Sequence, residues 1–261
     1  MPSRPAHKRR RKKSGKTVLS PWWVLGAVVL LALGVALPHV LATRNPDKGA
    51  AAPQGYRHFM VDLSHHNPRK VVWDSLRVVL DTDGRTSRDL AHARQILPLT
   101  HVIVKATEGE NHLDRHFDTW WAESSQAGLS RGAYHFFRSS KDPLRQAQHY
   151  TSRVSLTHRD LPPILDIETA HKGCTREELN RKALQWLQAV EKHYGRKPIV
   201  YTGDAFARDW LSSDITAQYP LWIARYNSEP PLTPGWKFWQ FTDKAVVHGI
   251  SGTVDLSVII P

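Results

Sequence analysis

The sequence is poor in sulfur chemistry and has none of the common nucleotide-binding or serine-nucleophile motifs. It contains one cysteine, Cys174, so no disulfide can form within the chain and an exported domain of this kind must be held by its core alone. No glycine-rich dinucleotide motif follows an apolar run, no P-loop lysine is present, and no G-x-S-x-G elbow occurs. These absences argue against nucleotide-dependent enzymes and serine hydrolases.

Acidic residues are missing from residues 1–17, which carry eight Lys and Arg side chains. Removing these eight from the formal net charge of +12 leaves only +4 for the rest of the chain, so the basic character belongs to a cytoplasmic tail. We therefore expect no nucleic-acid partner for the folded part. A tail that binds DNA or acidic lipid would explain nothing about the domain that follows.

Lys, Arg, Asp and Glu are also absent from residues 18–42, whose densest part reads WWVLGAVVLLALGVAL. A membrane-spanning helix needs roughly 20 apolar residues, so this run predicts one transmembrane helix with the bilayer as its partner. The basic flank places the N-terminus in the cytoplasm and the domain in the periplasm or outside the cell, by the preference of Lys and Arg for inside loops. A cleaved signal peptide is the alternative.

The rest of the chain is organised as a linker at 43–55 and one domain at 56–261. Eight short apolar runs predict strands, at Tyr56–Leu63, His101–Ala106, Gly132–Phe137, Pro163–Ile167, Pro198–Thr202, Leu221–Ala224, Lys237–Phe241 and Val254–Ile259. Amphipathic stretches predict helices at Asp118–Ala127, Leu144–Val154, Arg176–Tyr194 and Ala205–Leu211. This order predicts an α/β fold, an irregular TIM-like β/α barrel with fewer helices in its second half. Residues 77–98 are expected to form a peripheral loop with a short helix.

Two carboxylates close the fourth expected strand, in PPILDIE. Asp166 and Glu168 are two residues apart, so they share one side of the strand with their bases about 6 to 7 Å apart. Repulsion and an apolar surround then raise the proton affinity of one of them, which suits a glycosidase. The spacing equally allows a loop cap for Asp166 and an ion pair for Glu168.

The first expected strand also ends on polar residues, with Asp62 followed by Ser64, His65 and His66. Asp255, in the last strand, would be the neighbour of Asp62 where the barrel closes. Adjacent histidines on an extended chain face opposite ways, and no other set has ligand spacing, so we expect no metal site.

Aromatic side chains near strand ends are candidates for contact with sugar rings. Trp222, Tyr226 and Trp239 lie in or just after late strands, and packing in the core explains such residues equally well. Tyr134 and Tyr201 also lie near strand ends, where a phenol could bond to a sugar carbonyl or hydroxyl.

Eight motifs occur in a familiar order: VDLSHHN, VIVKATEG, GLSRGAYHFFR, PPILDIE, PIVYTG, LWIARYN, WQFT and VDLSVI. Together they resemble glycoside hydrolase family 25, the Chalaropsis-type lysozymes, from Tyr56 to the C-terminus. The resemblance implies an N-acetylmuramidase that cleaves the β-1,4 bond between N-acetylmuramic acid and N-acetylglucosamine in peptidoglycan glycan strands. It implies no cofactor, and the sequence indicates no obligate protein partner.

Residue by residue, Glu168 matches the general acid of the family and Asp166 the carboxylate that orients or stabilises the substrate acetamido group. Asp62 and Asp255 match two further site aspartates. Positions that resemble site-lining residues are Lys105, Glu108, Tyr134 and Tyr201.

The separation of the carboxylate pair bears on the mechanism, because it exceeds the roughly 5 to 5.5 Å expected when one carboxylate attacks directly. Assistance from the substrate's own acetamido group is our hypothesis. One departure from the family is Ser257, where Asn is common, and it could alter the bonding around Asp255. A membrane-bound peptidoglycan-binding protein that kept the groove and lost turnover is the alternative function.

Overall fold

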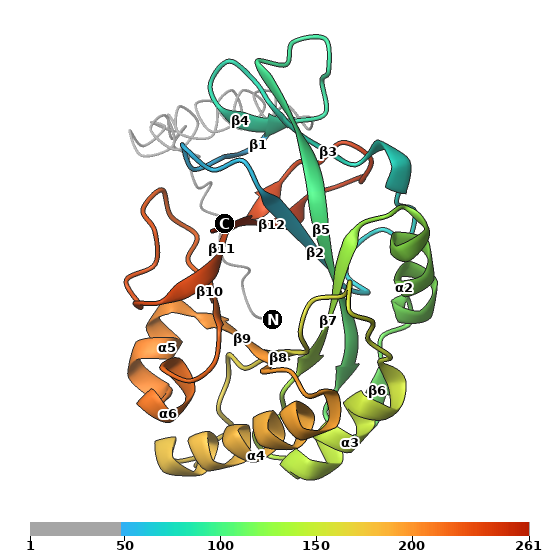
Figure 1. The fold of residues 1–261 in the computed structure, drawn as a ribbon. Helices are drawn as coiled ribbons and strands as arrows, with labels where there is room; N and C mark the ends of the chain where they lie inside the picture. Colours follow the sequence, from blue (N-terminus) through green and yellow to red (C-terminus); the bar gives the residue numbers. More distant parts are fainter. Residues whose placement is uncertain (1–47, 261) are drawn as a thin grey trace, which may run out of the picture. The chain divides into compact units, whose positions relative to one another are not determined.

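The computed structural model describes residues 48–260, and its central feature is a closed barrel of eight strands (Figure 1). Around the barrel the pairing runs β2-β5-β7-β8-β9-β10-β11-β12 and returns to β2. The strands are β2 (Phe59–Leu63), β5 (Gln95–Glu108), β7 (Ser130–Phe136), β8 (Ile164–Asp166), β9 (Ile199–Gly203), β10 (Leu221–Ala224), β11 (Trp236–Ala245) and β12 (Val254–Ile259). Each contains or overlaps one of the expected strands, so the predicted barrel is confirmed.

The last strand runs against its neighbours. All pairings from β2 through β5 to β11 are parallel, whereas β12 is antiparallel to both β11 and β2. A parallel return requires a crossover of a dozen or more residues, and residues 246–253 are too few for one. The barrel is therefore parallel except at its closure.

Helices lie on the outer side of the barrel (Figure 1). They are α2 (Phe117–Gln126), α3 (Pro143–Arg153), α4 (Arg176–Tyr194), α5 (Asp204–Trp210) and the short α6 (Ser213–Thr216), together with a 3-10 turn, η1 (Trp73–Ser75). The four expected helices are confirmed to within one residue at each end. Helix α4 begins because the Thr175 hydroxyl accepts the Glu178 amide hydrogen, and it ends at Gly195, whose φ of 66° is left-handed.

Residues 77–98 do not form the loop and short helix that we expected. They contain β3 (Arg77–Leu80), β4 (Arg85–Ser87) and the first part of β5, and with β1 (Lys48–Ala51) they build a small antiparallel sheet in the order β1-β4-β3-β5. A tight turn at Asp81–Gly84 connects β3 and β4, with the Gly84 φ at 72°. Strands of four and three residues on either side of such a turn are too short for periodicity to distinguish them from a loop. Strand β1 lies inside the stretch that we expected to be a linker.

Two hydrophobic cores result from the alternation of side chains along the strands. The larger lies between the barrel and the helices, and the smaller fills the barrel itself. The barrel interior contains Met60, Ile103, Ile164, Ile199, Tyr201 and Trp222. Gly132 makes room for them, because a Cβ there would lie 2.6 Å from Ile103 Cδ1. The interior is thus a packed floor for whatever lies above it.

Within residues 48–260, no helix is both long and apolar enough to cross a bilayer. The basic tail at 1–17, the expected transmembrane helix at 18–42 and residues 43–47 of the expected linker lie outside the described residues.

Candidate active site

Polar side chains stand directly above the apolar floor at the carboxyl ends of the parallel strands. In each strand the next inward-facing position, two residues beyond a floor residue, carries the polar group: Asp62 after Met60, Lys105 after Ile103, Asp166 after Ile164. Tyr134 and Tyr201 occupy the equivalent inward positions of β7 and β9. The register therefore brings most of the predicted site residues to one end of the barrel.

Asp166 is a buried carboxyl with unused bonding capacity. It is 6% exposed, and its Oδ1 has no hydrogen-bond partner among the described residues. Burial, and next the charge of Glu168, raise the pKa of Asp166 well above its ordinary value. A buried acceptor without a donor is costly, so this oxygen is suited to a donor that a ligand supplies.

Glu168 lies at the rim, two residues beyond Asp166. The residue as a whole is exposed, yet partial removal of its carboxyl from water raises its pKa, and the positive charge of Lys105 opposes that rise. This carboxyl is accessible and tends to hold its proton. That combination is required of a general acid.

Asp62 and Asp255 form a second carboxyl pair across the closure of the barrel. They are direct partners in the antiparallel register of β2 and β12. Burial and then the neighbouring charge of Asp255 raise the pKa of Asp62 well above its ordinary value, while burial raises the pKa of Asp255 to about 6. The pair therefore retains a proton over much of the acidic range.

Gln240 on β11 connects this pair to two phenols, and sequence analysis did not identify it. Its Nε2 donates to Asp62 Oδ1 at 2.9 Å, and its Oε1 accepts from Tyr201 Oη at 2.8 Å and from Tyr226 Oη at 2.9 Å. Gln240 is 1% exposed. The WQFT motif contains it, and alternation along β11 would have placed it on the inward face once the register was known.

Lys105 and Glu108 form an ion pair next to the carboxyl groups. Lys105 Nζ lies 2.6 Å from Glu108 Oε2, and Arg138 Nε donates to Glu108 Oε1 at 2.9 Å. Although burial opposes it, contact with Lys105 and Arg138 lowers the pKa of Glu108 to about 2. Glu108 is thus held ionised and positions Lys105, whose charge faces Asp166 and Glu168.

The aromatic candidates divide between the site and the core. Tyr226 is 55% exposed beside the site, and Trp222 packs below it against Tyr201 with its indole N–H donating to Ser257 Oγ at 3.0 Å. Trp239 does not lie where we expected a residue that contacts sugar rings. It faces outward from β11, is 1% exposed, and packs in the outer core. It neighbours inward-facing Gln240, so alternation places it on the other side of the strand.

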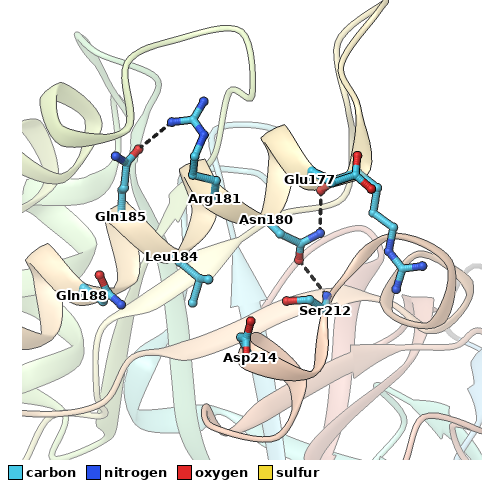
Figure 2. A pocket seen from close by; sticks show the side chains of 9 residues that line it. Glu177, Asn180, Arg181, Leu184, Gln185, Gln188, Ser212 and Asp214 are labelled. Carbon is cyan, nitrogen blue, oxygen red and sulfur yellow. Dashed lines mark hydrogen bonds between the residues drawn. The ribbon is translucent and has the colours of Figure 1, made fainter.

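An open depression adjoins the carboxyl cluster. Its walls include Glu168, Asp204, Phe206, Arg225, Tyr226 and Asn227, from the ends of β8, β9 and β10. A second depression lies on the outer face of the domain between α4 and the Ser212–Asp214 segment (Figure 2). None of the predicted site residues lines that second depression.

The histidines that follow Asp62 serve a structural contact. His65 Nδ1 lies 2.7 Å from Asp114 Oδ2, and the centroids of the His65 and His66 rings lie 3.9 Å apart. In the described part of the chain, one group of three side chains has metal-ligand spacing, and it does not include them.

Known proteins resemble this chain in sequence and in fold. The model of a family described as "Glycosyl hydrolases family 25" matches residues 61–250. The chain is 40% identical over 162 residues to the uncharacterized protein YegX of Escherichia coli O6:H1 (strain CFT073), covering 61% of this chain and 59% of that one. It is 29% identical over 198 residues to lysozyme M1 of Streptomyces globisporus, covering 67% of each chain.

Among solved structures, the bacterial lysozyme of Streptomyces coelicolor is similar with a TM-score of 0.66 and 25% identity, over 80% of this chain and 94% of that one.

Proposed function

The chain belongs to glycosyl hydrolase family 25, and from this premise we propose that it hydrolyses the β-1,4 bond between N-acetylmuramic acid and N-acetylglucosamine in peptidoglycan. The names of its relatives support this substrate, since they include an autolytic lysozyme from Clostridium acetobutylicum and an N,O-diacetylmuramidase from Arthroderma benhamiae. The observation that carries the proposal is the accessible carboxyl of Glu168 with a raised pKa above the buried carboxyl of Asp166.

Glu168 is the proposed general acid. Its proton passes to the glycosidic oxygen as the bond from that oxygen to the anomeric carbon breaks, so the leaving sugar departs as an alcohol. The open depression beside Glu168 offers room for the glycan on that side. The carboxylate that remains then accepts a proton from the water that completes hydrolysis.

The proposed nucleophile is the acetamido oxygen of the substrate. Asp166 ends β8 and Glu168 lies two residues beyond it, and the spacing of an extended chain puts their bases about 6 to 7 Å apart, which is wide for direct attack by a carboxylate. In this proposal the unpartnered Oδ1 of Asp166 accepts the acetamido N–H, orients the group and stabilises the positive charge that develops on it. A glycan without the 2-acetamido group should therefore not be cleaved.

We also propose that residues 18–42 anchor the protein in the cytoplasmic membrane as a single pass, with the N-terminus in the cytoplasm and the domain in the periplasm or outside the cell. The uncharged composition of this run and its basic flank support the proposal. Membrane fractions washed with alkaline carbonate should retain the full chain. Release into the wash, or a mature N-terminus beyond residue 42, would instead indicate a cleaved signal.

The experiment that tests the activity is digestion of purified peptidoglycan by the full-length protein, followed by borohydride reduction and mass spectrometry of the products. Reduced N-acetylmuramic acid ends establish a muramidase, whereas reduced N-acetylglucosamine ends would assign the other glycosidic bond. Tight binding to the wall without new reducing ends would favour a membrane-bound peptidoglycan-binding protein.

A further inference from the structure

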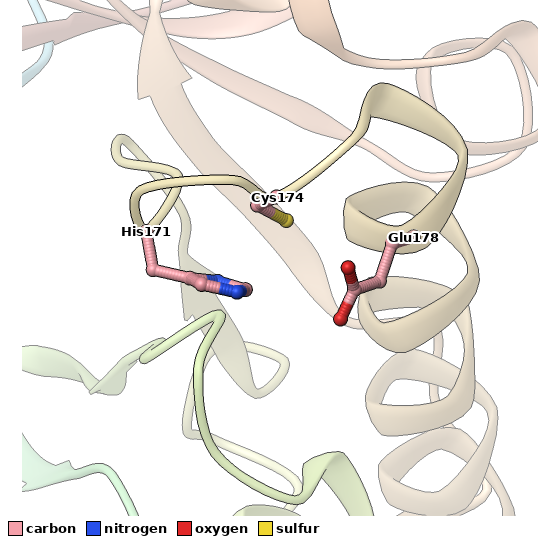
Figure 3. Close-up of side chains that lie close together, drawn as sticks. All are labelled: His171, Cys174 and Glu178. Atoms are coloured by element: carbon pink, nitrogen blue, oxygen red, sulfur yellow. The ribbon is translucent and has the colours of Figure 1, made fainter.

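Three side chains with different metal-binding atoms converge in the segment that follows β8. His171 and Cys174 lie in the loop before α4, and Glu178 lies in the first turn of that helix (Figure 3). Their ligand atoms all lie within 4.8 Å of one another, and no other group of three among residues 48–260 has this spacing. In Figure 3 the imidazole of His171 and the carboxylate of Glu178 point toward the same space beside the thiol.

The donor set favours one class of metal. A thiolate, an imidazole and a carboxylate are the three side-chain ligands that zinc accepts, whereas calcium and magnesium prefer oxygen ligands throughout. Ligands of a tetrahedral zinc lie roughly 3.5 Å apart, given bonds of about 2.0 to 2.3 Å. Rotation of the half-buried His171 and Glu178 side chains would therefore need to close about 1 Å.

The surroundings prepare two of the three ligands. Ser139 Oγ lies 3.2 Å from His171 Nδ1 and also accepts the His171 amide hydrogen at 2.8 Å. A zinc-bound histidine commonly uses its second ring nitrogen in this way, and here Nε2 is left for the metal. Lys182 Nζ contacts Glu178 Oε1 at 2.8 Å, so the other carboxylate oxygen remains available.

We propose that His171, Cys174 and Glu178 bind one zinc ion, with a water in the fourth position. The ion pair with Lys182 and the start of the helix explain where Glu178 lies, but they do not explain why an imidazole and a thiol converge on it. The site joins the loop that begins just after Glu168 to the first turn of α4. This inference does not depend on which glycan the protein cleaves.

Cobalt provides a direct test, because it replaces zinc and gives a near-ultraviolet charge-transfer band when a thiolate binds it. The chain has one cysteine and fifteen histidines, so such a band can arise only at Cys174 and is separate from cobalt bound to other histidines. The full-length protein, without a histidine tag, is titrated with cobalt and then with zinc. We expect a band that saturates at one cobalt per chain and disappears when zinc displaces the metal.

Variants then test whether the three residues act together. His171→Ala and Glu178→Gln should each weaken cobalt binding by at least about tenfold, because each removes one of three ligands. His158 and Glu177 are exposed and are not among the proposed ligands, so His158→Ala and Glu177→Gln are matched controls that should leave the titration unchanged. Two results would overturn the proposal. One is the absence of the band in the wild type, and the other is a titration midpoint in His171→Ala or Glu178→Gln that equals the wild-type midpoint.

A second measurement needs no substitution and so avoids variants that fail to fold. Zinc should slow alkylation of Cys174 in the unaltered protein, whereas magnesium and calcium should not. An alkylation rate that zinc does not change would overturn the proposal.

Discussion

Asp62 on β2 and Asp255 on β12 stand opposite each other in the register of the one strand that closes the barrel antiparallel, and burial together with the charge of Asp255 raises the pKa of Asp62. The chain reversal at β12 is what makes them direct partners. Because both carboxyls are largely removed from water, the native protein binds protons there more tightly than the unfolded chain does.

The first prediction is that Asp255 lowers the free energy of unfolding at alkaline pH. The pKa of Asp255 is about 6 in the folded protein, against an ordinary value of 3.8. The contribution of Asp255 to the free energy of unfolding is therefore fully present below about pH 4 and is lost as the pH rises through 6. Asp255→Asn should therefore be more stable than wild type at pH 8, by up to about 3 kcal/mol, and the difference should vanish toward pH 4. Denaturant unfolding at several pH values measures this.

Asp214→Asn, at an exposed position on α6, is the control and should show no such dependence on pH. A constant difference between Asp255→Asn and wild type from pH 4 to pH 8 would contradict the assignment.

The second prediction concerns Lys105, whose positive charge lowers the pKa of both Glu168 and Asp166. Lys105→Met removes that charge, so the pKa of Glu168 should rise. The alkaline limb of the pH profile of kcat/KM should move to higher pH, because the general acid stays protonated longer. Lys197→Met, at an exposed lysine that donates to the Gln218 carbonyl, should leave the limb in place.

The third prediction concerns Gln240, which holds Asp62 and two phenols together. Gln240→Leu removes all three hydrogen bonds and leaves the Tyr201 hydroxyl buried without its partner. The free energy of unfolding should therefore fall by roughly 2 to 3 kcal/mol. Activity should fall by at least about tenfold, because Asp62 loses its donor. Tyr226→Phe removes one bond at a half-exposed ring and should cost under about 1 kcal/mol. Equal stability and activity in the two variants would contradict the network.

The fourth prediction separates Trp239 from the aromatic residues of the site. Trp239 packs against Tyr56 and Trp236, and its indole N–H donates to the Arg225 carbonyl at 2.9 Å. Trp239→Phe should lower the free energy of unfolding by about 1 to 2 kcal/mol and leave KM unchanged. Tyr226→Ala should instead raise KM with little effect on stability. A raised KM in Trp239→Phe would return that residue to the site.

The eight barrel strands could be predicted because each is an apolar run between helices or turns, and both faces of each strand are buried. The pair Asp166 and Glu168 could be predicted because alternation along one strand needs no knowledge of its neighbours. The reversal of β12 and the small sheet of β1, β3 and β4 could not, since they depend on connection lengths and pairing across the fold.

Within the site, the missing information was register. Gln240 and Trp239 are adjacent, and only the pairing of β11 with β10 and β12 decides which of them faces inward. Ser257 illustrates the same limit: we expected it to influence Asp255, whereas its hydroxyl accepts from Trp222 within the floor of the barrel. The cluster of His171, Cys174 and Glu178 was missed because a loop and a helix start bring it together.

The most direct test of the proposed role of Glu168 compares wild type and Glu168→Gln on two substrates. One is peptidoglycan, and the other is an aryl glycoside of the same disaccharide whose nitrophenolate leaving group departs without a proton. In Glu168→Gln the rate of reducing-end release from peptidoglycan should fall by at least about a hundredfold. The variant should keep much of its turnover of the aryl glycoside. Release from peptidoglycan at the wild-type rate would show that Glu168 is not the general acid.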